Sequence, residues 1–192
     1  MTIDPRQLHY CAEVLRFRRA LNLTSVDNEA DFIDRFIAPS IALLPWLPDG
    51  ALVLDIGSGM GVPGIPLLIA RGDLHGILVE RRKKRAEFLR HIVRELSLPC
   101  EVYADDIAKL PPLNVDAVVA RAVAEPAVLL NMSREHVCEG GIALLPSGES
   151  RNAGDVDGWC MRELAELQFD DSVKQQVYCY QRVVNEEVSR ET

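Results

Sequence analysis

The sequence contains no long apolar run, and its first residues do not have the pattern of a signal peptide. Its longest stretch without a charged residue, residues 56–70, is interrupted by glycine and proline. It is also shorter than the roughly 20 apolar residues that a helix needs to cross a bilayer. The first 20 residues carry six charged side chains, which does not fit the apolar core of a signal peptide. We therefore expect a soluble, cytoplasmic protein with no membrane partner.

Cysteine patterns that hold metals are also missing. The five cysteines are an odd number and lie far apart, with no CxxC pair and no Cys/His cluster at zinc-site spacing. We expect buried or free thiols, as is usual in a reducing compartment, and no bound metal. The cysteines are Cys11, Cys100, Cys138, Cys160 and Cys179.

Positive charge is scarce overall but concentrated locally. The 21 Lys and Arg residues stand against 29 Asp and Glu, and this net charge of -8 argues against binding nucleic acid through overall charge. Residues 75–94, however, hold seven Lys or Arg against two Glu, a local net of +5. This segment is either a phosphate-contacting surface for RNA or a solvated first helical turn. The candidate RNA contacts are Arg81, Arg82, Lys83, Lys84 and Arg85.

Short apolar runs alternate with helical patterns along most of the chain. This alternation predicts a Rossmann-like α/β fold, a doubly wound and mostly parallel sheet with helices on both faces. At 192 residues one domain is expected, with a helical N-terminal extension over 1–48 and an α/β core over 49–192. Helices are expected over Asp4–Ala20, Glu29–Trp46 (bent at Pro39), Ile65–Ala70, Lys84–Leu96, Pro126–Cys138 and Asp155–Leu167. Strands are expected over Ala51–Ile56, Gly76–Glu80, Glu101–Tyr103, Val115–Ala120, Gly141–Leu145 and Val173–Val184, the last either alone or with a partner hairpin.

A glycine-rich turn follows the first expected strand and precedes a helix. Its residues are Asp55, Gly57, Gly59 and Gly61 within the run DIGSGMG, and such a turn lets a ligand approach the backbone closely. Glu80 closes the second strand, where a carboxylate can accept hydrogen bonds from the ribose hydroxyls of a nucleoside cofactor. The turn and the acid together predict a nucleoside-cofactor site at the carboxyl ends of these strands.

The glycine spacing distinguishes between cofactors. A dinucleotide pattern G-x-G-x-x-G needs glycine at position 62, where this chain has Val62. The spacing instead resembles the first motif of class I S-adenosylmethionine-dependent methyltransferases. A nicotinamide dehydrogenase remains an alternative.

Several further segments occur in an order that resembles one family. They are Asn22-Leu23-Thr24, Leu43-Leu44-Pro45-Trp46, VLDIGSGMGVPGIP over 53–66, Lys84-Arg85 with Phe88-Leu89-Arg90, and Arg121-Ala122. Over roughly residues 8–148 the chain resembles the GidB family, bacterial methyltransferases of guanine N7 in small-subunit ribosomal RNA. The block at 53–66 is the most specific part of this resemblance.

The resemblance implies a seven-stranded methyltransferase sheet preceded by N-terminal helices. It also implies that S-adenosylmethionine is the cofactor and that the small ribosomal subunit or its RNA is the partner. Carried over by position, the cofactor contacts fall on Gly57, Val62, Glu80, Ile107 and Ala108. We also expect Asp106 at the cofactor, and Arg121 facing both cofactor and substrate.

Some positions differ from the family pattern. Phe36 and Pro39 stand where the family usually has histidine and aspartate, Asp105-Asp106 where it has Gly-Arg, and Ser147 where it has lysine. These differences keep two alternatives open: a methyltransferase acting on another RNA or a small molecule, and a non-catalytic cofactor-binding protein.

The expected reaction needs no catalytic residue in the strict sense. Guanine N7 presents an unprotonated lone pair, so no general base is required and positioning can supply much of the barrier. A carbon-5 pyrimidine methyltransferase would need a nucleophilic cysteine, but Cys100 precedes a strand, and we expect it to be a packed thiol.

Overall fold

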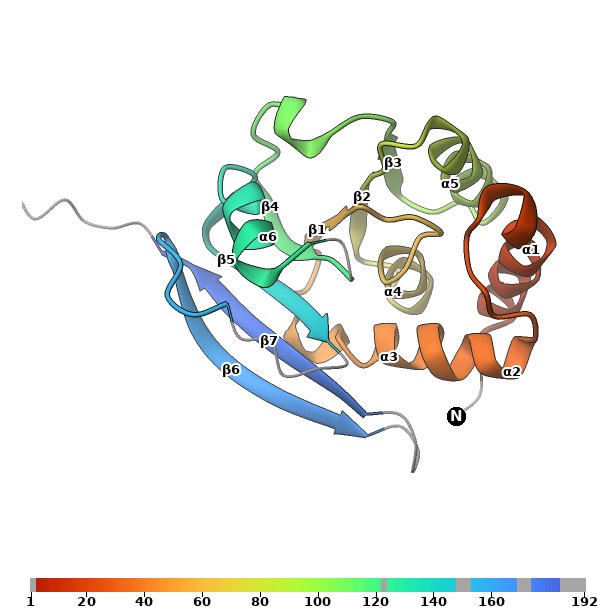
Figure 1. The fold of residues 1–192 in the computed structure, drawn as a ribbon, viewed down its shortest axis with the longest axis horizontal. Helices are drawn as coiled ribbons and strands as arrows, with labels where there is room; N and C mark the ends of the chain where they lie inside the picture. Colours follow the sequence, from red (N-terminus) through yellow and green to blue (C-terminus); the bar gives the residue numbers. More distant parts are fainter. Residues whose placement is uncertain (1–2, 122–123, 148–152, 169–173, 184–192) are drawn as a thin grey trace, which may run out of the picture.

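The computed structural model describes residues 3–121, 124–147, 153–168 and 174–183. These residues form one seven-stranded sheet in the order β3-β2-β1-β4-β5-β7-β6 (Figure 1). The pairs among β1 to β5 are parallel, whereas β7 runs antiparallel to both of its neighbours. The predicted mostly parallel, seven-stranded sheet is confirmed. The strands are β1 Leu52–Ile56, β2 His75–Val79, β3 Cys100–Tyr103, β4 Val115–Val119, β5 Val137–Ser147, β6 Trp159–Gln168 and β7 Lys174–Arg182.

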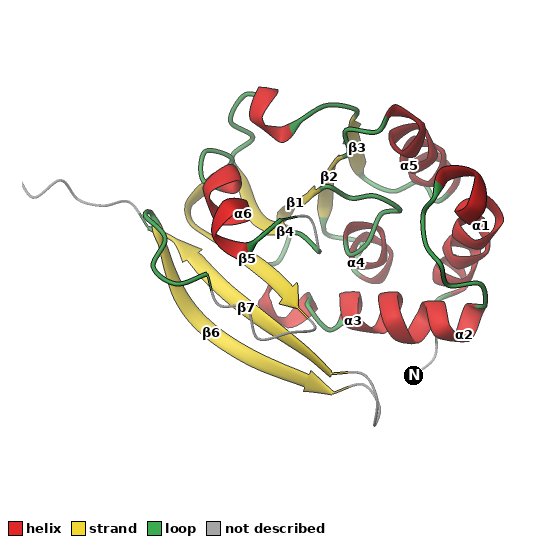
Figure 2. Ribbon diagram, viewed as in Figure 1, coloured by secondary structure: helices red, strands yellow, loops and turns green. Residues whose placement is uncertain are grey.

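Helices cover both faces of the sheet (Figure 2). One hydrophobic cluster lies between the sheet and helices α1, α4 and α5, and a second lies between the opposite face and α6. Neighbouring β1 residues alternate between them, with Val53 in the first cluster and Leu54 in the second. The helices are α1 Pro5–Leu21, α2 Glu29–Phe32, α3 Ala38–Ile41, α4 Gly64–Ala70, α5 Lys83–Glu95 and α6 Pro126–Ser133. Shorter turns are a π-helical segment Ile33–Ile37 and 3-10 turns Leu44–Trp46 and Ile107–Lys109.

Helix α1 is fastened at its start and along its inner face. The Asp4 carboxylate caps it by accepting a hydrogen bond of 2.8 Å from the N–H of Arg6, and Pro5 occupies the first turn. Further along, Gln7 Nε2 donates to the carbonyl of Pro66 at 2.9 Å. The N-terminal helix therefore packs directly against the segment that begins α4.

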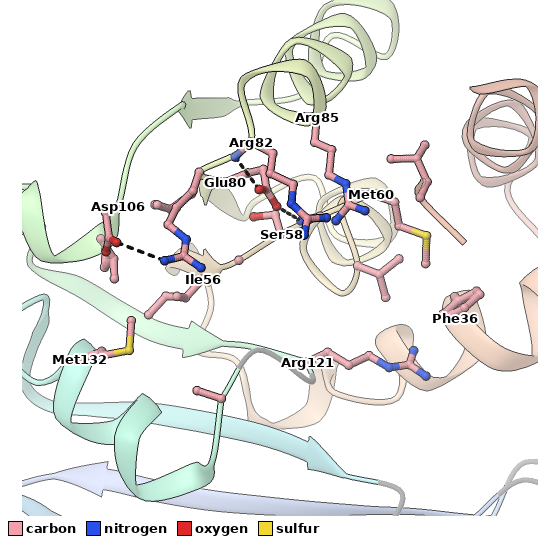
Figure 3. Close-up of a pocket in the computed structure, with 18 residues that line it drawn as sticks. Phe36, Ile56, Ser58, Met60, Glu80, Arg82, Arg85, Asp106, Arg121 and Met132 are labelled. Carbon is pink, nitrogen blue, oxygen red and sulfur yellow. Dashed lines mark hydrogen bonds and ion pairs between the residues drawn. The ribbon is translucent and has the colours of Figure 1, made fainter. Parts of the chain in front are cut away.

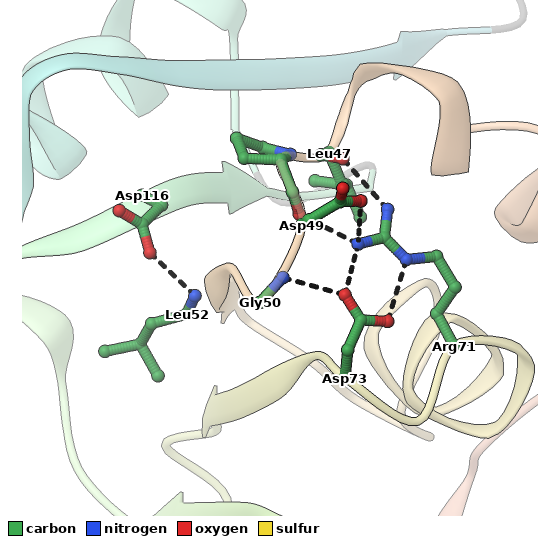
Figure 4. Close-up of polar contacts among 8 residues, drawn as sticks. Leu47, Asp49, Gly50, Leu52, Arg71, Asp73 and Asp116 are labelled. Atoms are coloured by element: carbon green, nitrogen blue, oxygen red, sulfur yellow. Dashed lines mark hydrogen bonds and ion pairs between the residues drawn. The ribbon is translucent and has the colours of Figure 1, made fainter.

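A polar cluster ties together the loops at the amino ends of β1 and β2 (Figure 4). The Arg71 guanidinium donates to the carbonyls of Leu47 and Pro48, each at 2.9 Å, and pairs with Asp73. Asp73 in turn accepts a hydrogen bond of 2.7 Å from the N–H of Gly50. The Arg71 hydrogen bond, and then that from Gly50, hold the pKa of Asp73 well below its usual value. This cluster connects the N-terminal segment to the sheet at the edge opposite the glycine turn.

Two predicted helices differ from the structure. Residues 155–167 were expected to be helical, but β6 begins at Trp159 and pairs with β7 along its whole length. The prediction was wrong because strand pairing with a distant segment decides the conformation here. The helix expected over Pro126–Cys138 ends at Ser133, because Val137 already pairs with Val115 in the sheet.

The helical stretch expected over Glu29–Trp46 is present but broken into pieces. A π-helical segment, Ile33–Ile37, separates α2 from α3, and it lies directly before the turn that contains Pro39. The disturbance expected at Pro39 is therefore found, as a local widening of the helix rather than a break. The ends of the last expected strand, Val173 and Val184, lie outside the described residues.

No helix among the described residues is long and apolar enough to cross a membrane.

Candidate active site

A cavity of about 860 Å³ opens at the carboxyl ends of β1, β2 and β4 (Figure 3). This is the edge at which open α/β sheets bind their ligands. Its lining comes from the ends of β1 and β2, from the segments that follow β1, β2, β3 and β4, from the N-terminal helical segment and from α6. The lining residues are Leu23, Phe36, Ile56, Gly57, Ser58, Gly59, Met60, Val62, Val79, Glu80, Arg81, Arg82, Arg85, Asp106, Ile107, Arg121, Ala124 and Met132.

The glycine turn wraps around the end of β2. The N–H groups of Gly57 and Ser58 both donate to the carbonyl of Val79, at 2.8 and 3.1 Å. Gly57 and Gly59 have positive φ angles of 68° and 58°, which favour glycine. Both glycines line the cavity, as does Val62.

Gly61 has a different role from the other two predicted glycines. Its φ is 104°, and a Cβ atom there would lie 2.5 Å from Cγ1 of Ile65. Gly61 is absent from the cavity lining and instead allows the turn to pack closely against α4. Close packing, rather than contact with a ligand, requires glycine at this position.

Asp55 lies buried beneath the turn. One of its carboxylate oxygens accepts a hydrogen bond of 2.9 Å from the N–H of Gly64, at the start of α4. A Cβ atom at Gly64 would lie 2.7 Å from that same oxygen, so only glycine fits there. Burial, reinforced by the nearby Glu80, raises the pKa of Asp55 to about 7, although the Gly64 hydrogen bond acts in the opposite direction. Asp55 therefore supports the turn from below and does not line the cavity.

Glu80 stands at the cavity wall, directly after β2. Its side chain accepts a hydrogen bond of 3.0 Å from the N–H of Gly59 and one of 2.7 Å from the N–H of Arg82. Glu80 is only 7% exposed, and that exposed part faces the cavity. A carboxylate has about four lone-pair positions, so two remain to accept hydrogen bonds from a ligand.

The segment after β3 forms the next part of the wall. Asp106 caps the 3-10 turn by accepting a hydrogen bond of 3.2 Å from the N–H of Ala108, and its other oxygen lies 3.5 Å from Arg81. Asp106 and Ile107 line the cavity, whereas Ala108 does not. Asp106 is therefore paired with Arg81, the first residue of the basic run Arg81–Arg85.

The residues of the basic run line two neighbouring cavities, and Arg82 and Arg85 line both. Arg81, Arg82 and Arg85 line the main one, and a second cavity of about 470 Å³ lies between the end of α1 and the start of α5. Arg85 Nε donates to the carbonyl of Leu21 at 3.2 Å, which joins the two helices. The second cavity is lined by Ala20, Leu21, Asn22, Arg82, Lys83, Lys84 and Arg85.

Arg121 lies on the side of the cavity opposite Glu80 (Figure 3). Its Nη1 donates to the carbonyl of Arg35 at 2.8 Å, and its Cζ lies 4.9 Å from the ring centroid of Phe36. Burial, and then the nearby Arg35, lower the pKa of Arg121, which still stays charged at neutral pH. Ala122, the other residue of this motif, lies outside the described residues.

Sequence reasoning missed several of the apolar lining residues. Met132 and Ile56 lie near the Asp106 end, and Met60 and Phe36 lie at the other (Figure 3). Ile56 and Met60 lie within the DIGSGMG run, in which only the acid and the glycines were singled out, whereas Phe36 and Met132 come from distant segments that no local motif marks as cavity lining. For Phe36 there were two signals: Pro39, whose position in a helical stretch indicated an irregularity nearby, and the departure from the family pattern at position 36 itself.

The donor set fits a nucleoside cofactor such as S-adenosylmethionine. The carboxylate of Glu80 suits ribose hydroxyls, and the apolar side chains of Ile56, Ile107 and Met132 suit the faces of an adenine ring. Among the described residues, no cluster of His, Cys, Asp or Glu could hold a metal ion.

Cys100 has neither the position nor the chemistry of a nucleophile. It begins β3 and so lies at the amino edge of the sheet, away from the cavity. Burial raises the pKa of its thiol to about 12, the reverse of what an activated nucleophile needs. It is partly buried and forms no disulfide.

Comparison with known proteins adds a family match. The family model GidB, described as rRNA small subunit methyltransferase G, matches residues 5–179. A ribosomal RNA small subunit methyltransferase G from Chromobacterium violaceum is 34% identical over 154 residues, which are 72% of this chain and 74% of that protein. The proteins of that name from Desulfotalea psychrophila and Xanthomonas oryzae pv. oryzae are 40% and 33% identical. The first match covers 65% of this chain and 60% of the relative, and the second covers 84% and 78%.

Solved structures confirm the fold. A SAM-dependent methyltransferase from Aquifex aeolicus superposes with a TM-score of 0.63 at 17% identity, covering 81% of this chain and 94% of that one. The putative methyltransferase yhhF from Escherichia coli gives 0.62 at 14% identity, covering 84% and 92%.

Proposed function

The chain belongs to the GidB family, the rRNA small subunit methyltransferases G, and from that premise we propose that it transfers a methyl group from S-adenosylmethionine to N7 of a guanine in small-subunit (16S) ribosomal RNA. The partner is then the small ribosomal subunit or its RNA, and the site of action is the cytoplasm. The observation that carries this proposal is the cavity at the carboxyl ends of the strands, with the glycine turn and Glu80 on one wall and Arg121 on the other.

The Glu80 side of the cavity is the proposed cofactor end. The two free lone-pair positions of Glu80 accept hydrogen bonds from ribose hydroxyls, and the glycine turn leaves the backbone open beside them. Ile107 and Met132 enclose the adenine faces, next to the capped turn that Asp106 begins. Bound in this way, S-adenosylmethionine supplies an electrophilic methyl group on a positively charged sulfur.

The proposed reaction needs no proton transfer by the protein. The N7 lone pair forms the new N–C bond while the S–C bond breaks, so positive charge passes from sulfur to the purine and no proton moves. The protein's part is to hold the two reactants in line and to exclude water. The lining agrees with this, because both of its carboxylates, Glu80 and Asp106, already accept hydrogen bonds that fix their orientation.

The basic run is the proposed contact with the RNA backbone. Arg81, Arg82 and Arg85 line the main cavity. Lys83 and Lys84 line the second cavity, so positively charged side chains continue from one cavity to the other. A strand whose target base enters the main cavity would place neighbouring phosphates over this surface. The overall acidity of the chain does not oppose this, because the acids concentrate in residues 135–192, which carry 12 acids against 5 Lys and Arg.

The test is methyl transfer to a defined substrate. Purified protein is incubated with methyl-labelled S-adenosylmethionine and small subunits from cells that lack the gene, and the RNA is then digested to nucleosides for mass spectrometry. We expect labelled N7-methylguanosine from the small-subunit RNA and none from large-subunit RNA. Label in another RNA or small-molecule fraction would favour a different substrate. Cofactor binding without any transfer would favour a non-catalytic role.

A further inference from the structure

The position of Arg121 is set by a segment more than 80 residues earlier in the chain. Its Nη1 donates to the carbonyl of Arg35 at 2.8 Å, and its guanidinium carbon lies 4.9 Å from the centroid of the Phe36 ring. Figure 3 shows the Arg121 side chain extending along the cavity toward Phe36. Two neighbouring residues of the π-helical segment thus hold one guanidinium, by a hydrogen bond and by a cation–π contact.

Pro39 explains why the Arg35 carbonyl can accept this bond. In a regular helix that carbonyl would accept from the N–H four residues later, which is position 39. Pro39 has no N–H and cannot donate that bond, and Arg35 itself lies in the π-helical segment Ile33–Ile37, where the α-helical bonding pattern is interrupted. The guanidinium of Arg121 takes that place.

Phe36 is itself held by a row of aromatic rings. Its ring lies 5.1 Å from that of Phe32, which lies 5.8 Å from that of Tyr10 in an edge-to-face arrangement. Phe32 and Tyr10 are fully buried, and the Tyr10 hydroxyl donates to the carbonyl of Met60 in the glycine turn at 2.9 Å. The row therefore connects the turn on one side of the cavity with Arg121 on the other.

We propose that Phe36 is a positioning residue that fixes the Arg121 guanidinium at the substrate end of the cavity. With one Nη engaged by Arg35 and the flat face against the ring, the remaining N–H groups are directed by this arrangement toward acceptor oxygens of the target nucleotide. Phe36 acts through Arg121 and does not itself take part in the reaction. The inference rests on the proposed function, since it assigns Arg121 to the substrate end of that same cavity.

The test replaces the ring while keeping an apolar side chain. In Phe36→Leu and Phe36→Met, we expect kcat to fall about 5- to 30-fold, the equivalent of about 1–2 kcal/mol for a partly desolvated cation–π contact. The KM for RNA and the affinity for S-adenosylhomocysteine should change less than about twofold, and Phe36→Tyr should restore kcat. A loss shared equally by kcat, cofactor affinity and thermal stability would mean a structural role and would overturn the proposal.

Phe17 offers a matched control. The Phe17 ring also forms a cation–π contact, with Cζ of Arg16 5.1 Å from its centroid. This ring packs against Phe88 and His91 and does not line the cavity. Phe17→Leu removes the same kind of contact, and we expect kcat to stay at the wild-type value. An equal loss in both variants would count against a specific role for Phe36.

A double-mutant cycle shows whether Phe36 acts through Arg121. In the Arg121→Ala background, Phe36→Leu should lower kcat no further, because the group it positions is gone. Independent, multiplicative losses would overturn the inference.

A spectroscopic reading separates this inference from the proposed function. The Nε–H proton of Arg121, assigned by its absence in Arg121→Lys, lies beside an aromatic ring and should show a ring-current shift that Phe36→Leu removes. This result is expected even if the wild-type protein methylates no ribosomal RNA. An unshifted proton in the wild type would refute the arrangement of Phe36 and Arg121, whatever the activity.

Discussion

The hydroxyl of Tyr10 on α1 donates a hydrogen bond of 2.9 Å to the main-chain carbonyl of Met60, in the middle of the glycine turn. Tyr10 is fully buried, so this bond is shielded from water. The first helix of the chain therefore supports the glycine turn that lines the cavity. The residues before β1 thus contribute to the structure of the site, because α1 supplies the hydroxyl that binds the Met60 carbonyl.

Removing this hydroxyl should weaken the fold at the site. Tyr10→Phe leaves the Met60 carbonyl buried without its partner, which costs about 1–3 kcal/mol of unfolding free energy. Urea denaturation followed by circular dichroism measures that loss, and calorimetry with S-adenosylhomocysteine should show weaker binding in the same variant.

Tyr103→Phe is the matched control for Tyr10. Its hydroxyl donates to Glu101 at 2.8 Å in an exposed position, so its removal should change stability by no more than about 0.5 kcal/mol. If the two variants lose the same free energy of unfolding, the buried Tyr10–Met60 hydrogen bond contributes no more to stability than the exposed Tyr103–Glu101 bond.

Glu80→Gln tests the proposed ribose contact while keeping the shape of the side chain. The amide oxygen can still accept from one of the two main-chain N–H groups, of Gly59 or Arg82, but the other bond is lost, and so is the charge that strengthens hydrogen bonds to a ligand. We expect affinity for S-adenosylhomocysteine to fall by about 1.5–3 kcal/mol in titration calorimetry. Glu87→Gln, on the exposed side of α5, should bind as the wild type does. Unchanged binding in Glu80→Gln would remove Glu80 from the cofactor site.

The parts of the fold that could be predicted from the sequence are those set by local pattern. The run from Asp55 to Gly61 contains its own strand end and turn, and Glu80 closes the next strand, so both could be placed beside a cavity before the structure was known. Among the described lining, Arg121 was found only through the family resemblance, since a single arginine after a strand has no local pattern.

The predictions that were wrong or incomplete concern residues whose structure depends on contacts between distant segments. Residues 159–168 form a strand because β7 pairs with them, although the spacing of Met161 and Leu164 suits a helix equally well. Phe36 was not predicted to be a site residue for a similar reason, because only folding brings its ring next to Arg121. The structure also separates residues that one motif had grouped: Gly61 and Asp55 support the turn, whereas Gly57 and Gly59 face the cavity.

Salt dependence should reveal the RNA-contacting role of the basic run. Each lysine that neutralises a phosphate of single-stranded RNA contributes about 0.7 to the slope of log K against log salt. Lys83→Gln and Lys84→Gln, at the second cavity, should each weaken binding of small-subunit RNA and lower that slope by about this amount. Arg94→Gln, in the last turn of α5, removes the same charge far from both cavities and should leave the slope unchanged. Equal effects at all three positions would indicate general charge attraction only.

The buried carboxyl of Asp55 should make the ligand-free protein less stable as pH rises. Burial raises its folded pKa to about 7, whereas in the unfolded chain the pKa is about 3.9. Between these values the folded protein keeps a proton that the unfolded chain has released. Each pH unit in this window therefore removes up to about 1.4 kcal/mol of stability, a loss that is complete once the pH passes the folded pKa.

Asp55→Asn keeps the acceptor for the Gly64 N–H but cannot ionise, so its stability should fall less than that of the wild type between pH 5 and pH 8 in urea titrations. Asp73→Asn is the contrasting control. The pKa of Asp73 is held low by Arg71 and by the Gly50 N–H, so its contribution is already complete above about pH 4 and is lost only as the pH falls further. Asp73→Asn should therefore be less stable than the wild type by a constant amount across this window. Parallel curves for Asp55→Asn and the wild type would show that Asp55 is ionised throughout, with its second oxygen solvated beneath the glycine turn.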